Sequence, residues 1–132
     1  MRWVALGLAL VLSSGCSGSE GPESPEGAVR LFITAARTGD RGSVYARLGP
    51  ATRERIEGLQ NSIRTLSGRT HIKPADFLSV GWAPPAWEPA GTRLLKRTPN
   101  RAEVEVYSSS GDRHTVLLVR EGRDWKIELP GR

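Results

Sequence analysis

The chain has 132 residues, enough for one domain, and a formal net charge of +5 from 19 basic and 14 acidic residues. The basic residues are scattered and form no long run or stripe, which argues against a nucleic-acid-binding protein. The single cysteine, Cys16, excludes an intrachain disulfide.

Residues 1–16 have the layout of an export signal. Arg2 precedes an apolar stretch over residues 3–12, and small residues follow it as far as Cys16. The apolar stretch is too short for a membrane-spanning helix, which needs about 20 residues. It also lacks the polar alternation of a helix that packs on a domain. We therefore expect these residues to direct export rather than to join the fold.

The Ser14-Gly15-Cys16 ending resembles the lipobox of bacterial lipoproteins, although Ser13 stands where that family usually has leucine. The resemblance implies a diacylglyceryl thioether on Cys16 and cleavage before it. Two or three acyl chains hold a protein on a membrane far more firmly than one chain does. Ser17 replaces the aspartate that retains many of these lipoproteins in the inner membrane. We expect an outer-membrane protein that faces the periplasm.

The composition divides the chain into three parts. Residues 17–24 contain only Ser, Gly, Pro and Glu, so they predict a flexible polar tether. The predicted organisation is therefore a signal peptide at 1–15, a lipidated cysteine with its tether at 16–24, and a domain at 25–132.

Helices are expected in the first half of the domain. Ser24 and Pro25 predict a helix start, and Gly39 predicts its end. The apolar residues of this first helix share one face. They are Ala28, Val29, Phe32, Ala35 and Ala36. Asp40 is expected to cap a short second helix, which the Gly49-Pro50 pair ends.

A third helix is predicted from Ala51 to Leu66, with Gly68 as its stop. Its apolar residues recur at helical spacing, and most of the charged residues of its first turns are expected to face water. The apolar set is Ile56, Leu59, Ile63 and Leu66, and the charged set is Arg53, Glu54, Arg55 and Glu57. A short helical turn is expected at 74–78, followed by an irregular segment at 80–82.

The last third has strand periodicity. Strands are predicted at 93–97, 102–107, 115–120 and 125–129, with turns between them. Apolar and polar residues alternate at 102–107 and 125–129, and 115–120 is the most apolar of the four. Helices followed by such a meander predict an α+β fold, with N-terminal helices packed on a curved antiparallel sheet of about four strands.

Two segments resemble bacterial lipoproteins with an NTF2-like (cystatin-like) domain of the DUF4878 type. They are SPEGAVRLFITAARTGD at 24–40 and HTVLLVREGRDWKIE at 114–128. The resemblance implies a cone in which a bent sheet wraps a long helix. It implies no particular activity, because function belongs to sites and not to folds.

Aromatic residues are the first candidates for a binding site. Trp82 and Trp87 lie among prolines, where a loop can present them to a ligand or partner, and Tyr45 is a third candidate. Trp125 alternates with Ile127 and is expected in the core instead. The partner is expected to be an envelope protein or a small apolar ligand.

Catalysis is the alternative. His71, His114 and Asp76 would form an acid–base set if they converged in a pocket, as in an isomerase, dehydratase or hydrolase of NTF2-like type. Two distant histidines with no cysteine pair predict no metal site. Glu103 and Glu105 share a strand face that is expected to be solvated. We expect a non-enzymatic, membrane-anchored binding or scaffold domain that needs no cofactor.

Overall fold

The computed structural model describes residues 21–68, 73–77 and 88–131, apart from the side chains of Asp76 and Phe77. Within these ranges no helix is long and apolar enough to cross a membrane. Cys16 and its neighbours, and the predicted irregular segment at 80–82, lie outside the described residues.

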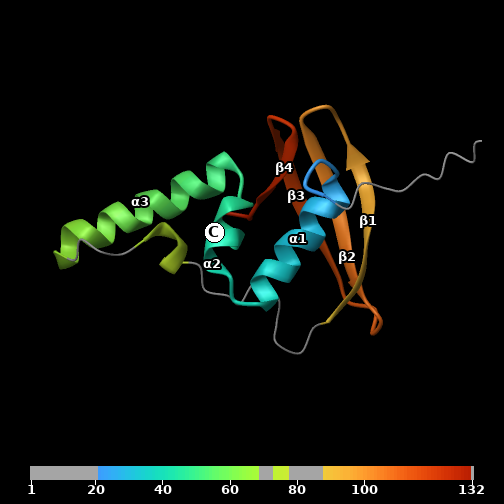
Figure 1. The fold of residues 1–132 in the computed structure, drawn as a ribbon, viewed down its shortest axis with the longest axis horizontal. Coiled ribbons are helices and arrows are strands. Elements are labelled where there is room, and N and C mark those ends of the chain that lie inside the picture. The colour runs from blue at the N-terminus through green and yellow to red at the C-terminus, as the bar shows by residue number, and fades with distance from the viewer. Residues whose placement is uncertain (1–20, 69–72, 78–87, 132) are drawn as a thin grey trace, which may run out of the picture.

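Three helices precede a four-stranded antiparallel sheet (Figure 1). The helices are α1 (Pro25–Arg37), α2 (Arg41–Ala46) and α3 (Pro50–Ser67), followed by the short 3₁₀ helix η1 (Pro74–Phe77). The strands are β1 (Pro89–Arg97), β2 (Arg101–Ser108), β3 (Arg113–Glu121) and β4 (Asp124–Glu128), and they pair in chain order. This confirms the predicted α+β class.

Helix α1 begins and ends where its capping residues predict. The Ser24 hydroxyl accepts a hydrogen bond from Gly27 N at 3.1 Å, and Pro25 stands at the first helical position. After the helix, Gly39 adopts a φ of +71°, which residues with a side chain rarely tolerate. Figure 1 shows α1 lying across one face of the sheet.

The core lies between α1, α2 and that face of the sheet. Alternate residues of the strands point inward, as the strand pattern predicted. The buried apolar residues are Ala28, Val29, Phe32, Ala35, Val44, Leu48, Ala102, Val104, Val106, Val116, Leu118, Trp125 and Ile127. Trp125 is only 1% exposed, so its expected place in the core is confirmed.

The link between α2 and α3 covers the outer edge of β4. Leu48 forms a parallel bridge with Ile127. Gly49 N donates to Ile127 O at 2.8 Å, and Ile127 N donates to Arg47 O at 2.9 Å. These bonds satisfy the backbone of β4 at its edge. They also place the start of α3 directly beside the last strand.

One predicted element needed correction, and the short helical turn is confirmed. Strand β1 begins at Pro89, four residues before the predicted start at Arg93, and Pro89 pairs with Ser108. Proline is tolerated here because it is the first residue of an edge strand. The helical turn expected at 74–78 is the 3₁₀ helix Pro74–Phe77.

Helix α3 extends one residue beyond the predicted Ala51–Leu66 at each end, and only part of its apolar set is covered, because Ile56 alone of the four packs on the core. Thr52 is its buried residue, whereas Leu59 and Leu66 of the apolar set are 53% and 87% exposed.

The charged residues of the first turns mostly face water, as predicted, and Glu54, Arg55 and Glu57 are exposed. Arg53, whose side chain is 29% exposed, also reaches Glu121 on β3, and Arg55 reaches the carbonyl oxygen of Leu129. The helix meets the sheet at its first turns, so the contacts there come from polar residues as well as from Ile56.

Candidate functional site

Most of the sequence-predicted site residues lie outside the described part of the chain. Cys16, His71, Trp82 and Trp87 are among them, and Asp76 belongs to η1 without a described side chain. Their roles therefore remain predictions.

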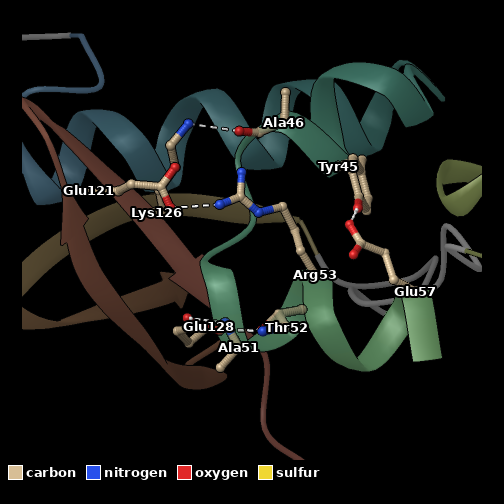
Figure 2. A network of polar contacts seen from close by, with 9 residues as sticks. All are labelled: Tyr45, Ala46, Ala51, Thr52, Arg53, Glu57, Glu121, Lys126 and Glu128. Carbon is tan, nitrogen blue, oxygen red and sulfur yellow. Dashed lines mark hydrogen bonds and ion pairs between the residues drawn. The ribbon is translucent and has the colours of Figure 1, made fainter. Parts of the chain in front are cut away.

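Tyr45 and His114 are described, and they belong to different layers of the fold. Tyr45 is half-buried on α2, and its hydroxyl donates to Glu57 Oε1 on α3 at 2.6 Å (Figure 2). Burial, and then the bond to Glu57, raise the pKa of Tyr45. His114 is exposed near the start of β3, opposite Val106 in the register. Tyr45 thus ties two helices together.

A polar network joins α3 to the sheet, and Glu128 is its centre. One Glu128 oxygen accepts from Ala51 N at 3.2 Å, and the other accepts from Thr52 N at 2.9 Å and the Thr52 hydroxyl at 2.5 Å. Figure 2 shows this carboxylate at the first turn of α3. Gly49 precedes that turn without a side-chain cap, so the strand residue satisfies the helix amides instead.

Two further bonds of the network reach β3 and β4. Arg53 forms an ion pair with Glu121 at 2.6 Å, and Lys126 Nζ donates to Ala46 O at 2.8 Å (Figure 2). Arg55 donates to the carbonyl oxygen of Leu129. The charged groups of the network are thus engaged with one another and with the backbone. The network positions α2 and α3, and sequence reasoning missed it because its partners lie far apart in the chain.

Ser108, Ser110 and Asp112 form a second polar cluster, at the turn between β2 and β3. The Asp112 carboxylate accepts from the Ser110 hydroxyl at 2.7 Å and the Ser108 hydroxyl at 3.1 Å. These bonds, that of Ser110 first, lower the pKa of Asp112. Asp112 N donates back to the Ser108 hydroxyl at 3.0 Å. The cluster closes the turn between β2 and β3.

Glu105 was predicted to lie on a solvated strand face, but its side chain is largely covered. Its carboxylate lies 2.8 Å from an Arg93 nitrogen and 3.5 Å from an Arg113 nitrogen, and its side chain is only 13% exposed. The two arginines come from the strands on either side of β2, so they fold over the carboxylate. Glu105 is a cross-strand ion-pair residue. Nothing links it to Glu103 as an acid–base pair.

The outer face of the sheet, which points away from α1, carries a hollow of about 280 Å³. Its lining includes the apolar Leu117, which is 48% exposed, and Val119, together with the charged Lys96, Arg101 and Glu103. A hollow that combines apolar residues with a few charged groups can contact another molecule.

Two guanidinium groups lie over the buried Trp125 ring at one end of the sheet. Those of Arg97 and Arg120 are 5.4 Å and 5.9 Å from the ring centroid. Cations at such distances are attracted to the ring, and their aliphatic stems cover it. This contact explains how a core tryptophan at the sheet end is shielded from water.

Among the described residues, no group of three or more histidine, cysteine, aspartate and glutamate side chains is arranged to hold a metal ion. No protein-family model, curated protein or solved structure matches the chain. The likeness to NTF2-like lipoproteins therefore remains a hypothesis that rests on the two quoted segments.

Proposed function

We propose that this chain is a cell-envelope lipoprotein, held on the periplasmic face of the outer membrane by lipid on Cys16. Its α+β domain acts as a non-enzymatic binding or scaffold module. The partner is another envelope protein or a small apolar ligand.

One observation carries the anchoring part of the proposal. Trp125 N donates to Pro22 O at 2.8 Å, so residue 22 already belongs to the domain. Pro22 lies six positions after Cys16, and a fully extended chain spans at most about 3.6 Å per residue. A lipid on Cys16 would therefore hold the domain within about 20 Å of the bilayer. The described core needs nothing before residue 25.

The binding part of the proposal is supported by what lies at the surface. Exposed leucines include Leu117 on the outer sheet face and Leu59 and Leu66 on α3. The described acidic and hydroxyl clusters are instead engaged in bonds that stabilise the fold. Exposed apolar patches with polar surroundings commonly mark contact surfaces.

The enzyme alternative requires His71, His114 and Asp76 to converge in a concave pocket. Of these side chains only His114 is described, and it lies at the exposed start of β3. No specific observation on the described residues favours this alternative.

The anchor is tested on protein isolated from bacterial membranes. Mass spectrometry of the N-terminal peptide is expected to show a diacylglyceryl thioether on Cys16 and no residue before it. The matched variant, Cys16→Ser, cannot form the thioether. In a detergent phase-partition assay, this variant is therefore expected to leave the detergent phase. An unmodified Cys16, or cleavage at another position, would refute the anchor.

The binding role is tested with a photoreactive side chain in living cells. Placed at Leu117 or Leu59, it is expected to form adducts with a partner, because both positions lie on exposed apolar surfaces. Ser109, an exposed turn residue, is the control position. Equal adduct yields at all three positions would contradict a specific binding surface.

A further inference from the structure

The second half of α3, residues 58–67, differs from the first half, and we call it the α3 arm. The bonds that join α3 to α2 and the sheet, described above, leave the helix from residues 51–57. Figure 1 shows α3 extending outward beyond α2, away from the sheet. The arm remains a regular helix and ends at Gly68, whose φ of +65° suits glycine.

An apolar seam runs along the arm. Its residues are Leu59, Ile63 and Leu66, which are four and three positions apart. Ile56, one turn earlier, is partly buried and packs on the core of its own chain. The seam has the d, a, d spacing of a coiled coil, with isoleucine at the a position and leucine at both d positions. That combination favours pairing of two helices. The exposed fractions, 53% for Leu59 and 87% for Leu66, leave these d residues accessible.

The charge of the arm suits a copy of itself. Arg64 is the only charged residue between Gly58 and Ser67, and the others are glycine, leucine, isoleucine and uncharged polar residues. Arg64 follows Ile63 directly, so it points away from the seam. Interface centres are depleted of charge, whereas an exposed helix usually carries many charged residues. Two such arms can meet without like-charge repulsion, and they offer little to a highly charged partner.

We propose that the α3 arm pairs with the α3 arm of a second copy of this chain. The contact is symmetric, because the same surface is used on both copies. The arm is about 15 Å long at 1.5 Å per residue, too short to bury the roughly 1,200–2,000 Å² of a stable soluble interface. Copies in dilute solution therefore associate weakly.

Confinement makes the pairing effective. Two proteins that bind each other weakly associate more often when both are held at high local concentration, as on one membrane. This part of the inference rests on the proposed lipid anchor at Cys16. The lipoprotein would thus form dimers whose population depends on its density in the membrane.

The test uses the mature lipidated protein in phosphatidylcholine vesicles at several surface densities. Donor and acceptor dyes are attached to separate preparations of Ser109→Cys, whose new thiol is distinct from the lipidated Cys16. Energy transfer is expected to rise with density above the value for random mixing. For the double variant Leu59→Ser/Leu66→Ser, energy transfer is expected to fall to the value for random mixing. Leu95→Ser, which alters a 44% exposed leucine on β1, should match the parent.

Transfer at the random value for the parent at every density would overturn the pairing. So would equal transfer for the parent and the Leu59→Ser/Leu66→Ser variant. If that variant lowers the melting temperature of the monomer and leaves transfer unchanged, the seam packs within its own chain and the proposal fails.

The anchor is read separately by mass spectrometry of the same preparation. If Cys16 carries no lipid, the proposed function fails, and the arm is then tested in solution by sedimentation equilibrium of the same three proteins at rising concentration. Association of the parent and of Leu95→Ser, but not of the double variant, would support arm pairing without the anchor. A monomer throughout would overturn it.

Discussion

Helices α1 and α3 carry apolar residues at helical spacing, and they use them differently. In α1 the apolar face is buried on the sheet, with Val29 and Phe32 no more than 1% exposed. In α3 the buried residue is Thr52, and the helix is held by a carboxylate and an ion pair at its first turns. The comparison shows that helical periodicity indicates which residues share a face. It does not indicate whether another element covers that face.

The largest expected difference is in how much stability one side chain of each helix contributes to the fold. Phe32→Ala removes a fully buried ring and should lower the free energy of unfolding by about 3–5 kcal/mol. Leu66→Ala removes a side chain that is 87% exposed and should change it by about 0.5 kcal/mol or less. Urea denaturation measures both. A similar loss in the two variants would show that α3 is packed as α1 is.

The cap of α3 comes next in size. Glu128→Gln keeps the shape of the side chain but removes its charge, and hydrogen bonds to a charged group typically contribute about 1.5–3 kcal/mol. We expect the variant to lose about that much stability and the amide of Thr52 to exchange faster with solvent. Faster exchange of the first α1 amides instead would contradict this local role.

Gly49→Ala and Gly58→Ala should change stability in opposite directions. A Cβ on Gly49 would clash with Glu128 Oε1 and stand 3.0 Å from its Cγ, so the capping carboxylate must move and the fold loses stability. A Cβ on Gly58 meets nothing within 4 Å, and alanine at this helical position should add about 0.5–1 kcal/mol. Thermal unfolding compares the two. A stabilising Gly49→Ala would argue against the Glu128 cap.

The smallest effect concerns the link between α2 and α3. Burial and the bond to Glu57 raise the pKa of Tyr45, so Glu57→Gln should lower it towards the ordinary value of about 10. An acid with a raised pKa in the folded state stabilises the fold fully below about pH 10 and loses this effect as the pH rises through the folded pKa. Ultraviolet titration in a Tyr107→Phe background isolates Tyr45. If Glu57→Gln left the titration of Tyr45 unchanged, Glu57 would not be a cause of its raised pKa.

Local signals in the chain predicted much of the fold correctly. The cap at Ser24, the stops at Gly39 and Gly68, and the strand alternation around Val104 all depend on residues close in sequence. The candidate site was less accessible to this reasoning. The sequence predicted Glu128 only as a polar residue of an alternating strand. Nothing near it in the chain indicates that Thr52, 76 residues earlier, donates hydrogen bonds to its carboxylate.

By itself the sequence determined the helices, the strands, their order and the apolar set available for a core. Capping, proline geometry and side-chain periodicity act over a few residues, so the chain carries them in readable form. Only the tertiary structure decided which apolar faces are covered and which charges meet. Those outcomes depend on distant segments arriving at one place. That is why α1 became the core helix, while α3, joined to β4 through Glu128, presents its leucines to the surroundings.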